Sequence, residues 1–224
     1  MERVKKTFFT SRNIATLGVL LALVIVLQAF GGSFSIGLVT LNFSLIPIAL
    51  GALVLGPVAG AILGFANGIV VLVQVIIAPL GFYYIIWTYS PVVTTLICIL
   101  KTTVAGLVSG ALFRLISRKN TYAATFVAAA AVPVVNTALF VLGCLCMPGT
   151  IGMFQDSMPD YSGMNIFVFI CVVLVTFNFF IELAINLVVS PALNSVYRVV
   201  EKQFIAAKSK KKSAPEEDSN DNLS

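Results

Sequence analysis

Two ionisable side chains lie deep within apolar stretches of this 224-residue chain. Lys101 lies about 15 Å into the stretch 91–116, at the helical rise of 1.5 Å per residue, and Glu182 lies past the middle of the stretch 164–196. At such a depth in a bilayer a charge costs about 3 kcal/mol or more, so it usually faces a cavity or a partner. Lys101 could hold an anionic group of a ligand, or it could pair with Glu182 in a structural network.

Side-chain amides extend this polarity. Glu182 belongs to a series at fourfold spacing, which shares one face of a helix. The series is Asn178, Glu182, Asn186, Ser190 and Asn194. Asn136, in the stretch 122–145, lies at about the depth of Lys101. We expect Asn136 and Asn178, together with Asn42 and Glu182, to bind polar atoms of a ligand; the alternative is hydrogen bonding between helices.

The segment 78–90 is rich in aromatic residues, which we expect to close this polar pocket. They are Phe82, Tyr83, Tyr84, Trp87 and Tyr89. We expect Tyr84 and Trp87 to contact the ligand. The alternative is an aromatic belt at the membrane surface.

Nothing in the sequence predicts catalysis. It has no phosphate-binding loop of the Gly-x-x-x-x-Gly-Lys-[Ser/Thr] type, and histidine, the commonest general base and metal ligand, is absent. The four cysteines lie in or beside apolar stretches, as small apolar side chains do. We therefore predict no catalytic residues, no metal site and no cofactor.

Composition indicates the elements that position these residues. The chain is 59% hydrophobic and 10% charged, against about 25% charged in soluble domains, and its mean hydropathy is +1.03. The net charge of +5 comes from short basic blocks beside apolar stretches, which argues against nucleic-acid binding. We predict an all-α protein in the lipid bilayer.

Apolar stretches of suitable length predict six transmembrane helices. They lie at 14–30, 39–55, 58–77, 91–116, 122–145 and 164–196. The predicted parts of the chain are a basic N-terminus (1–13), a six-helix membrane domain (14–204) and a disordered tail (205–224). With both termini in the cytoplasm, every Lys and Arg except Lys101 lies on the cytoplasmic side, as the positive-inside rule requires.

Small residues at fourfold spacing predict close helix packing. Gly56, Gly60, Gly64 and Gly68 lie on one side of the third span, and such stripes let two helix backbones approach closely in lipid. The simpler interpretation is packing inside one bundle. The alternative is that one small-residue face docks another subunit, and Gly18 with Ala22 in the first span is the best candidate.

Three stretches resemble the substrate-binding S component of energy-coupling factor (ECF) vitamin transporters. They are 39–68 (VTLNFSLIPIALGALVLGPVAGAILGFANG), 132–140 (VPVVNTALF) and 181–193 (IELAINLVVSPAL). The likeness extends over about residues 12–204. It implies a six-helix subunit of a bacterial plasma membrane that binds a vitamin near its outer face. It also implies three partners: a membrane coupling protein (T component) and two cytoplasmic ATPases.

The resemblance also suggests residue roles. In the family an Ala-x-x-x-Ala pair on the first helix meets the coupling protein, and here Gly18 and Ala22 stand in its place. The run 60–65 resembles the pantothenate-type branch, and Lys101, where relatives often have Arg, would suit a carboxylate. The riboflavin-type branch usually carries Asp where this chain has Asn42, so riboflavin or another vitamin is an alternative substrate.

One different class of function stays open at this point. A self-sufficient channel or secondary carrier could use Lys101 and Glu182 as an ion or proton relay. No inverted repeat of the kind found in such carriers is visible in the sequence.

Overall fold

The computed structural model describes residues 11–31, 35–36, 39–40, 42–77 and 82–212. Most of the predicted N-terminal segment 1–13 and the end of the predicted tail lie outside the described residues.

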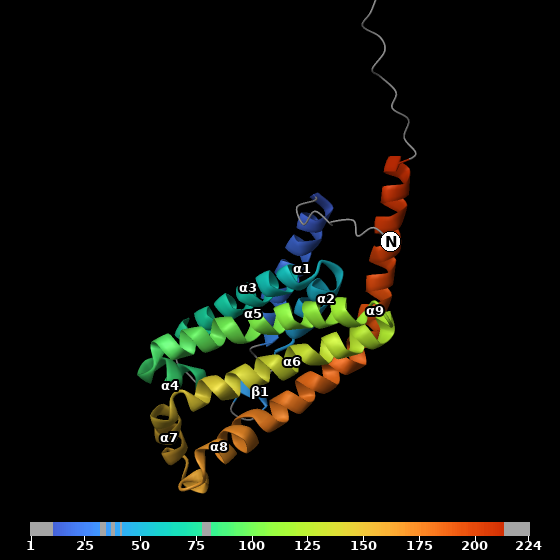
Figure 1. Ribbon diagram of the computed structural model, residues 1–224. Coiled ribbons are helices and arrows are strands. Elements are labelled where there is room, and N and C mark those ends of the chain that lie inside the picture. The colour runs from blue at the N-terminus through green and yellow to red at the C-terminus, as the bar shows by residue number, and fades with distance from the viewer. Residues whose placement is uncertain (1–10, 32–34, 37–38, 41, 78–81, 213–224) are drawn as a thin grey trace, which may run out of the picture.

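The described part is mainly helical (Figure 1). Two short strands, β1 (Ser35–Ile36) and β2 (Val39–Thr40), pair antiparallel, with Ser35 opposite Thr40. The helices are α1 (Ser11–Gly31), α2 (Leu45–Val54), α3 (Pro57–Ile77), α4 (Phe82–Tyr89), α5 (Pro91–Ile116), α6 (Thr121–Leu145), α7 (Pro148–Asp156), the 3-10 turn η1 (Pro159–Tyr161), α8 (Ile166–Val168), the π-helix η2 (Phe169–Val175) and α9 (Thr176–Lys212).

Five helical segments are long and apolar enough to cross a membrane. They are α1, α3, α5, α6 and the continuous rod Ile166–Gln203 made of α8, η2 and most of α9. The predicted second span, 39–55, differs: its helix is α2 alone, whose 10 residues extend about 15 Å, half of a hydrocarbon core. The prediction of a helical, multi-pass membrane protein is confirmed, with five long apolar helices and one short one.

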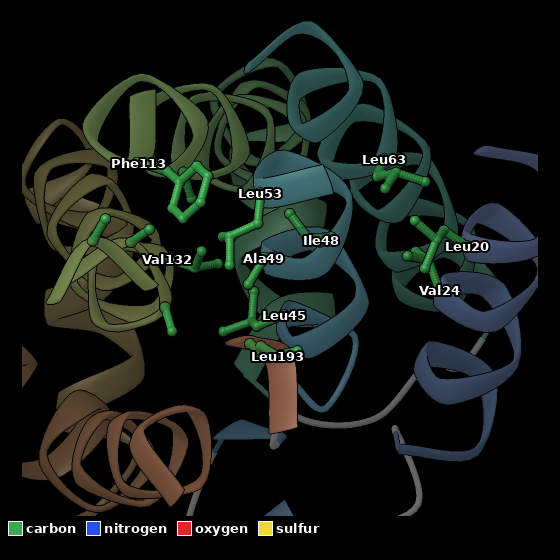
Figure 2. Packing of buried hydrophobic residues seen from close by; sticks show 14 residues of the cluster. Leu20, Val24, Leu45, Ile48, Ala49, Leu53, Leu63, Phe113, Val132 and Leu193 are labelled. Carbon is green, nitrogen blue, oxygen red and sulfur yellow. The ribbon is translucent and has the colours of Figure 1, made fainter. Parts of the chain in front are cut away.

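The short helix α2 lies at the centre of the bundle. It packs against α1, α3, α5, α6 and α9, and Figure 2 shows it between Leu20 and Val24 of α1 and Phe113 and Val132 of α5 and α6. Its apolar side chains are therefore buried in protein rather than in lipid. A positive φ at Gly56 (+105°), which L side chains rarely adopt, reverses the chain so that α3 can begin at Pro57.

Helices α3 and α5 meet backbone to backbone. A Cβ atom at Gly64 would collide with the carbonyl of Thr102, and the Thr102 hydroxyl donates to the Gly64 carbonyl at 2.7 Å. Gly60 and Gly106 face each other in the same way. Gly60, Gly64 and Gly68 of the predicted stripe mediate packing inside the bundle, whereas Gly56 lies in the connection before α3.

A polar knot holds α1 to its neighbours. Gln28 of α1 is buried, and its side-chain Nε2 donates to the side-chain carbonyl oxygen of Gln74 in α3 at 3.0 Å. The Ser44 hydroxyl, just before α2, donates to the Gln28 side-chain carbonyl at 3.0 Å. Most of the other α1 side chains are exposed, so this knot fixes one end of the helix.

Two short helices, α4 and α7, form what we call the cap at one end of the bundle (Figure 1). The aromatic segment expected to be a loop is largely the helix α4, because its apolar residues Phe82 and Ile86 lie four apart and are both buried. The Phe82 ring meets the Phe154 ring of α7 edge-on at a centroid distance of 5.1 Å.

At the other end of the molecule α9 continues to Lys212, beyond residue 204, where we expected the membrane domain to end.

A methyl group added at Gly64 should destabilise the protein, because it would be forced against the α5 backbone. We expect Gly64→Ala to lower the free energy of unfolding by about 1–3 kcal/mol, the range typical of overpacking, and to lower the midpoint of thermal unfolding in detergent. Gly18→Ala is the matched control, since nothing lies within 4 Å of the added atom. Equal midpoints for the two variants would contradict the close α3–α5 contact.

Candidate functional site

A polar cavity lies among the residues before α2, the cap helix α4 and the helices α5, α6, η2 and α9. Its empty volume, including the space at its mouth, is about 320 Å³. The lining combines one ammonium group, one carboxylate and three amides with apolar and aromatic side chains. It consists of Asn42, Tyr83, Lys101, Asn136, Thr137, Phe140, Leu174, Val175, Asn178, Phe179 and Glu182.

Lys101 is 2% exposed, and its only hydrogen bond in the described structure goes to a neutral group. Its Nζ donates to the Tyr83 hydroxyl at 2.9 Å and lies 5.0 Å from the Tyr83 ring centroid and 5.4 Å from that of Phe140. A phenol, with an ordinary pKa near 10, is uncharged at pH 7. Tyr83 therefore stabilises the ammonium through a hydroxyl lone pair and Phe140 through its ring, and neither neutralises the charge.

Glu182 is also buried, and its carboxylate is anchored to the backbone. Its Oε1 accepts a hydrogen bond from the Asn42 N–H at 2.9 Å, which ties α9 to the residues before α2. Lys101 and Glu182 thus line one cavity while their hydrogen bonds go to different partners. The described structure does not contain the direct Lys101–Glu182 hydrogen bond of the structural-network alternative.

Three amides in the lining have buried atoms without a hydrogen-bond partner in the described chain. They are Oδ1 of Asn42, Oδ1 of Asn136, and both Oδ1 and Nδ2 of Asn178. A buried polar group left unsatisfied costs about 1–3 kcal/mol, so such atoms are rare and call for a partner. Their convergence on one cavity is the arrangement of a site that a polar ligand or ordered water completes.

The π-helix η2 brings the last helical rod into the site. Leu174 and Val175 of η2 line the cavity immediately before Asn178, and the Thr176 hydroxyl donates to the Cys171 carbonyl at 2.6 Å, five residues back. Wider π turns occur often at functional sites because they change which side chains face inward. Asn178 and Glu182 follow at helical spacing and face the same cavity.

The family model for the ECF transporter substrate-specific component matches residues 12–194. The chain belongs to this family. Its members are substrate-binding subunits of transporters rather than enzymes, and in general they bind small molecules and couple to a T component and ATPases. A search of curated proteins gave no match.

Five of the seven side chains predicted to bind substrate in this family member line the cavity. They are Asn42, Lys101, Asn136, Asn178 and Glu182. Tyr84 and Trp87 do not line it, and Trp87 packs against the cluster of Val71, Val75 and Cys98 instead. Whether any of the seven binds a substrate stays a prediction.

Sequence reasoning named Tyr83 only as one of five aromatic residues expected to close the pocket, and it did not name Phe140; these two are the aromatic partners of Lys101. Helical spacing contains a signal for the second: Phe140 follows Asn136 by four residues and so shares its face of α6. Choosing Tyr83 over Tyr84 requires the rotational phase of α4, which eight residues of mostly aromatic sequence do not define.

The predicted docking pair lies away from the cavity. Gly18 and Ala22 of α1 are both exposed, and a Cβ atom at Gly18 would meet nothing within 4 Å. Unlike the glycines of α3 and α5, this pair has no packing role inside the described bundle.

The unpartnered amide of Asn178 should contribute nothing to the stability of the ligand-free protein. We expect Asn178→Leu to leave the free energy of unfolding unchanged or to raise it by about 1 kcal/mol. Gln155→Leu is the control, in which a buried side-chain amide has partners. The Gln155 Nε2 donates to the backbone carbonyls of Tyr161 and Met164 at 2.6 and 2.7 Å, so its loss should lower stability by at least about 1 kcal/mol. Thermal unfolding without ligand measures both, and an equal loss for the two variants would mean that Asn178 has a structural partner.

Proposed function

We propose that this protein is the substrate-binding subunit of an ATP-driven ECF importer in a bacterial plasma membrane, and that it captures a water-soluble vitamin bearing an anionic group, with pantothenate as the leading candidate. The observation that carries this proposal is the buried Lys101, whose ammonium contacts a neutral phenol and two aromatic rings. A carboxylate entering the cavity would give this ammonium a direct ionic partner, which Glu182 does not provide in the described structure. Riboflavin, which carries no carboxylate, would not.

We propose six membrane crossings with both termini in the cytoplasm. The chain leaves α1 at the end that carries Gln28, whereas Gly56 lies against the guanidinium of Arg114 at the last turn of α5. The segment between, which includes the buried α2, would therefore pass from one end of the bundle to the other. Arg12, Arg114 and Arg198 then share one side, which the positive-inside rule assigns to the cytoplasm.

The exposed pair Gly18 and Ala22 supports a docking face for the membrane coupling protein, through which two cytoplasmic ATPases would act. Residues one helical turn apart with small side chains form a shallow groove, and a second helix can approach closely there in lipid.

Mass spectrometry of the small molecule released from the purified protein tests the substrate directly. Release of a vitamin without an anionic group would overturn the pantothenate assignment.

Removing the charge of Lys101 should weaken binding of an anionic substrate. We expect Lys101→Met to raise the Kd for pantothenate at least about tenfold, equivalent to about 1.4 kcal/mol, by calorimetry on folded protein. Tyr83→Phe is the comparator, because it removes the hydrogen bond to Lys101 but keeps the charge and the ring. An unchanged Kd in Lys101→Met would rule out the role of Lys101 in holding a carboxylate.

Filling the α1 groove should separate binding from transport. We expect the double variant Gly18→Leu/Ala22→Leu to keep its substrate affinity and to lose uptake and copurified coupling protein, because the bulky side chains block the approach of a partner helix. Val19→Leu/Val26→Leu adds bulk to a neighbouring exposed stripe of α1 and is the control. A self-sufficient carrier would transport in liposomes alone and would either ignore the groove variant or lose binding and transport together.

A further inference from the structure

Half of the Glu182 carboxylate has no partner in the described structure. Oε1 accepts from the Asn42 N–H at 2.9 Å, and Oε2 has no hydrogen bond, although the side chain is 6% exposed and lines the cavity. An ionised carboxylate has about four acceptor positions, so most of its capacity remains available. A group donating to this oxygen would form a charge-assisted bond, roughly twice as strong as a neutral one.

The rest of the lining supplies further acceptors. The Oδ1 atoms of Asn42, Asn136 and Asn178 are buried without a donor, and the Asn178 Nδ2 is a buried donor without an acceptor. The three residues come from separate parts of the chain, namely the residues before α2, α6 and α9, and all three line one cavity. Lys101 is the one cation among the residues that line the cavity. The complementary ligand has one anionic group and several O–H or N–H donors.

We propose that Glu182 accepts a hydrogen bond from a substrate hydroxyl, so that the cavity selects hydroxylated acids over acids of the same shape without hydroxyl groups. This inference rests on the proposed function, in which Lys101 holds the carboxylate. It assigns the two ends of the substrate to two residues: Lys101 of α5 takes the anionic end, and Glu182 of α9 takes a hydroxyl-bearing part. Loss of the hydroxyl removes the partner of the carboxylate oxygen that faces the cavity, and sites built to bind a hydroxyl discriminate strongly against its absence.

The test compares two probes on three proteins. The probes are pantothenate and 3,3-dimethylbutanoyl-β-alanine, in which hydrogen replaces both hydroxyl groups of pantothenate while the carboxylate is retained. The proteins are the wild type, Glu182→Gln and Lys101→Met. Glutamine keeps the size of Glu182 and an oxygen for the Asn42 N–H, so the variant preserves the link between α9 and the residues before α2. The measured quantity is the ratio of the two Kd values for each protein.

We expect the wild type to prefer pantothenate by at least about thirtyfold, and Glu182→Gln to reduce this preference at least about fivefold through weaker pantothenate binding. Lys101→Met should weaken both probes alike and leave the ratio within about twofold, because both carry the carboxylate. These two outcomes together support separate roles for the two residues.

Three other outcomes overturn the inference. Equal affinity of the wild type for both probes shows that the site does not recognise the hydroxyl groups of pantothenate, and this conclusion does not depend on whether any variant folds. An unchanged ratio in Glu182→Gln, with both affinities reduced, shows that Glu182 acts only by anchoring Asn42. Binding of neither probe to the wild type means that the pantothenate proposal itself fails and the inference falls with it. The first two outcomes leave the proposed importer role standing.

Discussion

A charge inside a bilayer must be enclosed by protein, and the architecture of this molecule follows from that constraint on Lys101. The ammonium group lies 2% exposed on the inward face of α5, with the glycine-bearing contact to α3 on one flank and α6 on the other. Tyr83 of the cap and Phe140 of α6 surround it with polarisable rings. Glu182 lines the same cavity but forms no hydrogen bond with Lys101 in the described structure, so the ammonium faces a cavity rather than a direct salt bridge.

The short helix α2 explains why there is a cavity at all. A full-length span through the bundle centre would fill the space beneath the cap with apolar side chains. Instead, the helix begins at Leu45, and the residues before it place the Asn42 side chain and backbone N–H beside Glu182. Within α2 itself, Ile48 and Ala49 are fully buried by the surrounding helices. The residues before α2 therefore supply part of the wall of the site, and α2 fills the apolar core.

Sequence reasoning recovered the features that depend on long apolar runs or regular spacing. The long spans, the close packing of the α3 glycines and the face shared by Asn178 and Glu182 could all be predicted in this way, whereas the partner of the α3 glycines could not. The length of α2 could not be predicted, because an apolar side chain gives the same sequence signal whether protein or lipid surrounds it. The helical conformation of the aromatic segment was also not predicted. The rotational orientation of α4, which places Tyr83 in the cavity lining, therefore could not be predicted either. Side-chain partners across the bundle, such as Asn42 with Glu182, depend on three-dimensional proximity that no single segment encodes.

In the described part of the chain, none of the residues that line the cavity belongs to α1, the helix with the exposed Gly18–Ala22 groove. The polar knot at Gln28 links α1 to α3 and to the start of α2 at one end only. Substitutions that reshape the cavity therefore leave the groove as it is, and changes to the groove do not enter the cavity. Such a scaffold can therefore change the chemistry of its cavity while the exposed small-residue face of α1 stays the same.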